Sequence, residues 1–189
     1  MYQKQFMGIT MKNKIAFFLL LLMSFTFISC PRNFAIELEE NINKLLSESR
    51  IYVFDENDNK LLEKNLNFAE FSDLIIHRTE IDVSSLDNDF QHFQIIIKMK
   101  DGDLYAKEEF IDGFYISNIT VKNINNEEEK SNETQYCNRE DDEESSILIM
   151  NFDNSVNEVY SRLWFYNRQD LNNEIYTTTF TIRIINNSV

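Results

Sequence analysis

The chain has 189 residues, of which 18 are Lys or Arg and 32 are Asp or Glu, so its formal net charge at pH 7 is −14. Phosphate backbones repel a domain this acidic, which argues against nucleic acid as a partner and favours a neutral or basic protein. Two cysteines are too few for a disulfide framework, and the length suits one domain with a sizeable core.

The N-terminal segment has the order of a signal peptide. A short basic stretch beginning at Met11 is followed by the apolar run 15–28, and the small Ser29 then precedes Cys30. The run is shorter than the roughly 20 apolar residues that a membrane-spanning helix needs. We therefore expect residues 1–29 to be removed as a signal peptide, with Met11 as an alternative start of translation.

Residues 11–30 resemble the signal and lipobox of bacterial lipoproteins, in which the cysteine after the cleavage site receives diacylglycerol. Phe27 stands where most lipoboxes have leucine, a variation that spirochaete lipoproteins tolerate. The abundance of Asn, Ile, Lys and Phe, with only 3 Gly and 1 Pro, also resembles proteins of Borrelia-type spirochaetes. The resemblance implies a lipid on Cys30, a very short tether at 30–32, and a place in the cell envelope, at the outer membrane or cell surface in preference to the inner membrane.

Two alternatives to lipidation stay open at this point. The protein could be secreted with Cys30 as a free thiol able to bond Cys137, or the signal segment could remain as an uncleaved anchor. If residues 1–29 are removed, with or without a lipid on Cys30, the loss of three lysines changes the formal net charge from −14 to −17.

The segment 33–49 is predicted to be a helix. Phe34, Leu38, Ile42 and Leu45 recur at spacings of four, four and three residues, which places them on one helical face. Asn33 is the expected N-cap.

After Ile51 the apolar period becomes two, which predicts strands separated by polar turns. Asp101 and Gly102 form an expected type I′ turn of a hairpin, and the acidic segment 123–145 is expected to be a loop. Residues 33–189 are thus predicted to form a single α+β domain, an N-terminal helix followed by a mostly antiparallel β-meander or small sandwich. The expected strands are 51–54, 61–68, 74–83, 93–99, 104–110, 114–122, 147–152, 158–166 and 174–185.

The sequence gives little support for a metal site or for a nucleophilic residue. The segment 55–60 begins like a calcium loop, but it lacks the glycine and the glutamate that such a loop needs at its sixth and twelfth places. His77 and His92 have no metal-ligand spacing around them. Carboxylates near Cys137 should raise the pKa of its thiol. We expect no metal, no cofactor and no catalytic residue.

The strand 158–166 carries the strongest candidate for a binding face. It places Tyr160, Arg162, Trp164 and Tyr166 on one side and Val159, Leu163 and Phe165 on the other. Tyr, Trp and Arg are the residues enriched in binding hot spots. The same side chains could instead cover a second apolar layer, so both interpretations stay open.

The sequence favours a noncatalytic, lipid-anchored module of the cell envelope that binds another protein, in a surface-exposed and host-facing position. The first alternative is a periplasm-facing structural subunit of envelope assembly. The second is a small lipid-anchored hydrolase that uses a carboxylate such as Glu108, Glu109 or Asp112, which the sequence permits without singling one out.

Overall fold

The computed structural model describes residues 30–70, 78–86, 90–138, 146–170 and 174–186. The described residues from Leu38 onwards form one compact unit. The predicted signal peptide lies outside the described residues. Within those residues, no helix has the length and apolarity needed to cross a membrane.

The helix α2 spans Cys30–Leu45, so its predicted bounds are wrong at both ends. Asn33 lies inside the helix and is not its N-cap, and residues 46–49 already belong to strand β1, Leu46–Phe54. The predicted buried face is confirmed from Leu38 onwards, because Leu38, Ile42 and Leu45 are at most 7% exposed.

Four antiparallel strands form the first sheet, sheet A, in the order β11-β5-β1-β2. The predicted hairpin of β1 and β2 is confirmed, and it continues in register except for an irregularity at Val53 and Phe54. The centre of the sheet pairs β1 with β5, so strands from distant parts of the chain lie side by side. The bounds besides those of β1 are β2 Lys60–Asn65, β5 His92–Met99 and β11 Ile147–Asp153.

Seven strands form sheet B, with the main order β10-β8-β12-β13-β3. The strand β9 also pairs with β8, and β4 pairs with β13 in the one parallel arrangement recorded among the described strands. The bounds are β3 Phe68–Glu70, β4 Arg78–Asp82, β8 Gly113–Asn123, β9 Glu128–Ser131, β10 Gln135–Asn138, β12 Val156–Tyr166 and β13 Glu174–Ile185. Short 3₁₀ turns occupy Ser84–Leu86 and Arg168–Asp170.

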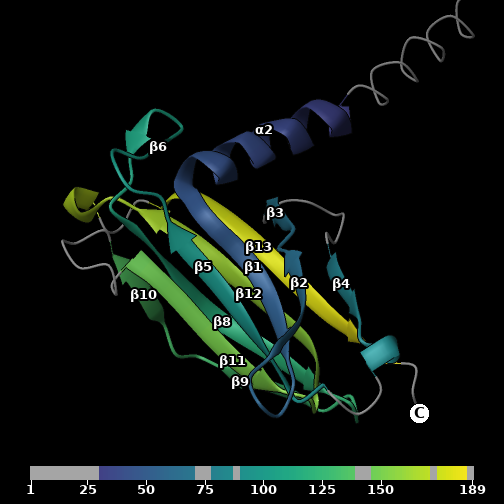
Figure 1. The fold of residues 1–189 in the computed structure, drawn as a ribbon. Coiled ribbons are helices and arrows are strands. Elements are labelled where there is room, and N and C mark those ends of the chain that lie inside the picture. The colour runs from purple at the N-terminus through teal and green to yellow at the C-terminus, as the bar shows by residue number, and fades with distance from the viewer. Residues whose placement is uncertain (1–29, 71–77, 87–89, 139–145, 171–173, 187–189) are drawn as a thin grey trace, which may run out of the picture. The chain divides into compact units, whose positions relative to one another are not determined.

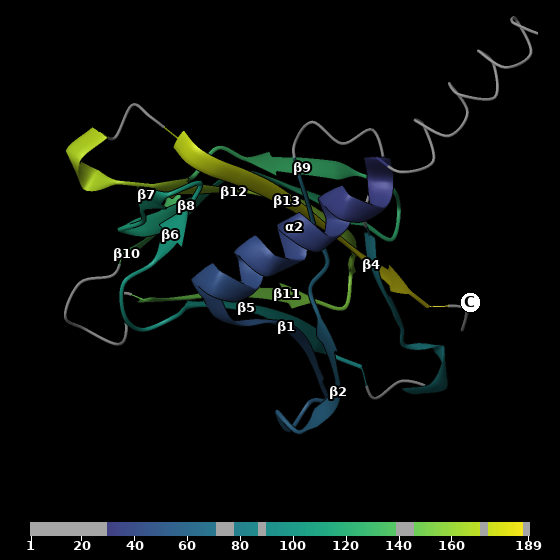
Figure 2. The same ribbon diagram turned by 90° about the horizontal axis from the view of Figure 1, so that it is seen from above.

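The two sheets pack face to face around one hydrophobic core (Figures 1 and 2). Each contributes alternate side chains, as half-apolar strands require. Sheet A supplies Phe93, Ile95 and Ile97, all with no exposed surface. Sheet B supplies Phe114, Val159, Leu163, Phe165 and Phe180, which are equally buried. The described part of the chain is therefore mostly antiparallel β-sheet with one α-helix, and its strand order is that of a sandwich and not of a meander.

The hairpin predicted at Asp101 and Gly102 is wrong. The strand β5 pairs with β1 and β11. Of the two proposed turn residues only Gly102 has a positive φ, of 91°, whereas a type I′ turn needs two. Such a turn occurs instead at Lys107 and Glu108, with φ of 50° and 66°, between β6 (Tyr105–Ala106) and β7 (Glu109–Phe110).

The acidic segment 123–145 is not simply a loop, because β9 and β10 lie within it. The first of these strands is exposed or half-exposed at every position, so no apolar alternation marks it in the sequence. In β10 the side chain of Cys137 is fully buried. Residues 139–145 lie outside the described part of the chain.

Substitution of Phe93 with alanine should test the shared core. Phe93 stacks on Phe152 with ring centroids 5.1 Å apart, and loss of such a ring leaves a cavity that costs about 3–5 kcal/mol. Urea unfolding should show that decrease in the free energy of unfolding. The control is Tyr105→Ala, because Tyr105 is 52% exposed and its loss should cost far less. Equal effects of the two substitutions would contradict the described core.

Candidate binding face

The alternation predicted for β12 is present in the structure. Val159, Leu163 and Phe165 have no exposed surface and belong to the core. On the opposite side Tyr160, Arg162 and Trp164 are half-buried, whereas Tyr166 is only 4% exposed. Three of the four predicted face residues are therefore partly accessible on the outer side of sheet B. The fourth, Tyr166, is covered by neighbouring residues.

Two further tyrosines join Trp164 on the outer face of sheet B. The ring of Tyr115 lies 6.2 Å from that of Trp164, with an interplanar angle of 17°, and 5.5 Å from that of Tyr136. Tyr136 is 64% exposed. We refer to Tyr115, Tyr136, Trp164 and Tyr166 as the aromatic cluster; it crosses three neighbouring strands, β10, β8 and β12.

The sequence alone did not bring Tyr115 and Tyr136 to this face. Tyr115 follows Phe114 in a predicted strand, and the alternation of that strand predicts opposite faces for the two side chains. Alternation alone does not predict that Tyr115 lies beside Trp164 of another strand. Tyr136 lay in the segment predicted as loop. The missing information was strand pairing, since Trp164 is opposite Tyr115 and Tyr115 is opposite Tyr136.

Hydrogen bonds fix the orientation of the outer side chains on β12. The indole nitrogen Nε1 of Trp164 donates to Oγ of Ser117 at 3.1 Å, and Nε of Arg162 donates to the Tyr160 hydroxyl at 3.1 Å. The indole N–H of Trp164 already has a protein acceptor. Further burial of the ring therefore breaks no hydrogen bond from the indole to water, which lowers the free-energy cost of that burial.

A bulge in β8 makes the bond from Trp164 to Ser117 geometrically available. Tyr160 pairs with Thr120 and Arg162 pairs with Ser117, so β8 has one more residue than β12 in this interval. Asn118 takes up the bulge with φ of 55°. The extra residue shifts the alternation of β8 and keeps Ser117 on the same face as Thr120.

Tyr166 is the most buried member of the cluster. A Cβ atom built on Gly113 would lie 2.7 Å from the Tyr166 hydroxyl oxygen and 2.5 Å from the carbonyl oxygen of Cys137, so only glycine leaves room at this position. The Tyr166 hydroxyl donates to Oδ1 of Asn138. Burial raises the pKa of Tyr166, which keeps the hydroxyl protonated as a donor.

Cys137 lies beneath the cluster as a free, fully buried thiol. Burial raises its pKa to about 12, in the direction that the sequence predicted but through loss of solvent instead of neighbouring carboxylates. A thiol in this state is a poor nucleophile at neutral pH, so its contribution is packing.

Charged residues near the other end of β12 pair with one another. Nζ of Lys122 lies 3.1 Å from Oε1 of Glu158, and Nη2 of Arg78 lies 3.9 Å from the other oxygen of the same carboxylate. The cross-strand register places Glu158 between Lys122 and Arg183, two residues before Tyr160 on β12. This charge pairing therefore lies near Tyr160, about 20 Å along β12 from Trp164, and not at the aromatic cluster.

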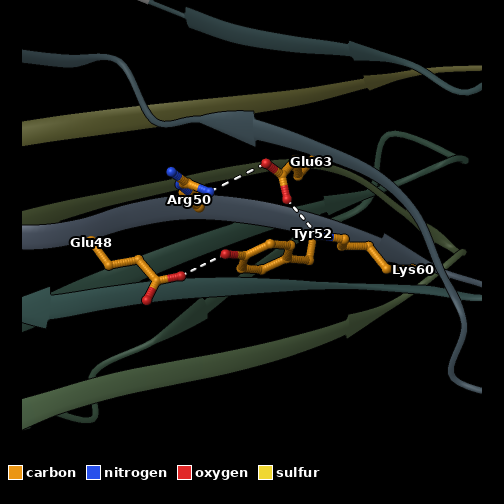
Figure 3. A network of polar contacts seen from close by, with 5 residues as sticks. All are labelled: Glu48, Arg50, Tyr52, Lys60 and Glu63. Atoms are coloured by element: carbon orange, nitrogen blue, oxygen red, sulfur yellow. Dashed lines mark hydrogen bonds and ion pairs between the residues drawn. The ribbon is translucent and has the colours of Figure 1, made fainter.

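The outer face of sheet A has a different character (Figure 3). Glu63 binds Nη1 of Arg50 at 3.2 Å and Nζ of Lys60 at 2.5 Å, while the Tyr52 hydroxyl donates to Glu48 at 2.6 Å. The Lys60 ammonium also lies 5.2 Å from the centroid of the Tyr52 ring. Exposed ion pairs of this kind add little to the stability of a fold, so the main effect of this network is to cover the Tyr52 ring.

The calcium-like segment is a hydrogen-bonded turn. Oδ1 of Asp55 accepts from the backbone N–H groups of Asn57 and Asn59, both at 2.8 Å, and Oδ2 accepts from Nδ2 of Asn59 at 2.9 Å. These bonds, led by the one from the Asn59 side chain, lower the pKa of Asp55. Within the described residues no group of three metal-ligating side chains comes together.

The other residues singled out from the sequence occupy separate places. His92 stacks on Phe54 with ring centroids 5.0 Å apart, and His77 lies outside the described residues. Glu108 and Glu109 are exposed at the β6–β7 turn. Asp112 accepts a hydrogen bond from the backbone N–H of Arg168 at 2.7 Å, which ties the start of β8 to the end of β12.

Comparison with known proteins adds no family to this description. The sequence matches no protein-family model, and no curated protein matches it either.

Substitution of Gly113 with alanine should destabilise the support of the aromatic cluster. Because the new Cβ would overlap backbone as well as the Tyr166 ring, we expect a loss of about 1–3 kcal/mol in chemical denaturation. Gly102→Ala is the matched control, since nothing lies within 4 Å of a Cβ there and the cost arises from its φ of 91° alone. An unchanged stability of Gly113→Ala would show that Tyr166 does not sit as described.

Proposed function

We propose that this chain is a lipid-anchored, noncatalytic binding protein of the cell envelope, which holds a neutral or basic protein through the aromatic cluster on sheet B. The observation that carries the proposal is the row of Tyr136, Tyr115 and Trp164 on the outer side of a rigid sheet. The lipid anchor is Cys30, and the most favoured setting is the outer membrane or cell surface.

The energetics of the cluster suit binding. Aromatic side chains offer a large contact area at low entropic cost, because only two torsion angles have to be fixed. Here those angles are already restrained by neighbouring rings and by the bond from Trp164 to Ser117. Covering one further large apolar side chain such as Tyr136 contributes roughly 1.5–3 kcal/mol. Two or three such contacts give a hot spot of ordinary size.

Charge favours a neutral or basic partner. The net charge of −14, or −17 once residues 1–29 are removed, creates an attractive field for cationic proteins. The same field repels a partner that carries many carboxylates.

Site-specific photocrosslinking tests the proposed face in intact cells that naturally express the protein. A benzophenone amino acid replaces Tyr136, or, as the control, Tyr105, which is 52% exposed but lies on the β6–β7 hairpin. We expect a discrete crosslinked product from position 136 and not from position 105. The additional substitution Trp164→Ala should reduce that product at least tenfold, because it removes the central ring.

Both label positions are tyrosines, so the two proteins differ only in the place of the probe. Thermal melting of each variant must show a folded protein before the comparison is made. Equal crosslinking from positions 105 and 136, or a product at 136 that persists after Trp164→Ala, would argue against the cluster as the binding face.

Metabolic labelling with a palmitate analogue tests the anchor. We expect label in the wild-type chain and none in Cys30→Ala, together with a shift of the variant from the detergent phase to the aqueous phase. Protease treatment of intact cells then distinguishes a surface position, where the protein is digested, from a periplasmic one. Absence of label in the wild type would leave a secreted or signal-anchored protein.

A further inference from the structure

Among the described strands, β11 is an edge of sheet A. It is the first strand in the order β11-β5-β1-β2 (Figures 1 and 2). Its seven residues pair with β5 without any register shift. Its sequence, Ile-Leu-Ile-Met-Asn-Phe-Asp, contains no lysine and no proline, and its one charge is the last residue, Asp153. Such an edge is a template for another strand.

Three other edge strands of the described sheets, β2, β3 and β10, show features that discourage pairing. The opposite edge of sheet A, β2, carries Lys60, Glu63 and Lys64, and Nζ of Lys64 donates to the backbone oxygen of Glu80 at 2.6 Å. On sheet B, β3 has three residues and β10 has four. Short strands and edge lysines are the usual protections, and β11 has neither.

The backbone of β11 directs half of its hydrogen-bonding groups away from β5. The N–H of Asn154 donates to the carbonyl of Gln91 at 2.9 Å, on the side of β5. Because the direction of N–H and C=O groups alternates along a strand, Asp153, Asn151 and Ile149 direct theirs away from β5. Ile149 is also 46% exposed on the outer face.

We propose that β11 pairs antiparallel with β11 of a second copy of this chain, about a two-fold axis at Met150, so that the two A sheets become one. In this register Leu148 is opposite Phe152 of the second copy and Met150 is opposite itself. The inner apolar layer then continues across the junction, since Leu148 and Met150 are 6% and 5% exposed and Phe152 is half-buried.

Charge within the strand favours a second copy as the occupant. In the two-fold register each Asp153 is opposite Ile147 of the other copy, and the two Asp153 residues lie six residues apart along the pair, about 20 Å at the rise of a β-strand. That separation exceeds the Debye length of ~8 Å at physiological salt, so the pairing creates no like-charge contact within β11. A strongly cationic peptide, by contrast, would find only one carboxylate in β11, at its end.

The remaining net charge sets the strength of this association. Two chains of −14 repel each other at long range, and a single pair of strands buries less area than most stable interfaces. The dimer is therefore weak and dependent on concentration, and it strengthens as salt screens the repulsion. This inference does not depend on the binding role proposed for sheet B.

Sedimentation velocity of the full chain in density-matched detergent, over a series of protein and NaCl concentrations, tests the pairing. We expect a monomer–dimer equilibrium that shifts to dimer at higher protein and higher salt. Asn151→Pro should remain monomeric, because proline removes an N–H that faces the free edge and no bond to β5. The matched control, Asn151→Ala, keeps that N–H and should dimerise like the wild type.

A second variant guards against misfolding of the proline protein. Ile149→Lys places an edge lysine at an exposed position and should weaken the dimer at least tenfold while melting like the wild type. A wild type that stays monomeric at the highest protein and salt, or variants Asn151→Pro and Ile149→Lys that dimerise as the wild type does, would overturn the proposal.

Cysteine pairing tests the register. Since Ile149 is opposite Asn151 of the second copy, a mixture of Ile149→Cys and Asn151→Cys proteins should form a covalent dimer on mild oxidation more readily than either protein alone. Ile124→Cys, at a 65% exposed position outside β11, is the control for random encounters. Equal yields from the mixture and from the separate proteins would overturn the two-fold register.

Discussion

The structure depends on one constraint, which is that two half-apolar sheets must cover each other. The strand β5 shows this best, because Phe93, Ile95, Ile97 and Met99 are at most 1% exposed while the residues between them face outward. At roughly 25 cal/mol for each Å² of apolar surface, burial on this scale is the main favourable term in folding. Burial of the inner faces requires β11, far along the chain, to pair with β5. It also requires the opposite face of sheet B to point outward.

The aromatic cluster follows from that commitment. With Val159, Leu163 and Phe165 in the core, Trp164 has to lie on the outer side of β12, and the pairing of β8 and β10 brings Tyr115 and Tyr136 to it. The bulge at Asn118 then supplies Ser117 as the acceptor for the indole. Positions that are separate in the sequence become one surface because strand pairing, and not local propensity, sets their neighbours.

The sequence predicted the parts of this fold that have a strong local pattern. Alternation identified the inward faces of β5 and β12 correctly, and helical spacing identified Leu38, Ile42 and Leu45 as a buried face. It failed where pairing or polar strands decide the outcome. Asp101 and Gly102 have the composition of a hairpin turn, but the partners of β5 come from distant segments, and the exposed β9 has no apolar alternation to read. The helix end at Leu45 was missed because Leu45 and Leu46 are both buried, on either side of the change from helix to strand.

In the proposed function, the charge of the chain acts on a partner at long range, and the aromatic cluster acts on it at contact. Glu127, Glu128 and Glu129 lie in or beside the β8–β9 turn, and the acidic segments contribute to a field that extends over about one Debye length. Such a field changes the rate at which a partner arrives more than the time it stays. At the aromatic cluster, the proposed contact is made by rings without net charge, so the residence time of a partner there would depend on apolar contact. Added salt should therefore act mainly on association at sheet B, whereas at β11, where both copies carry the same sign, it acts in the opposite direction and favours association.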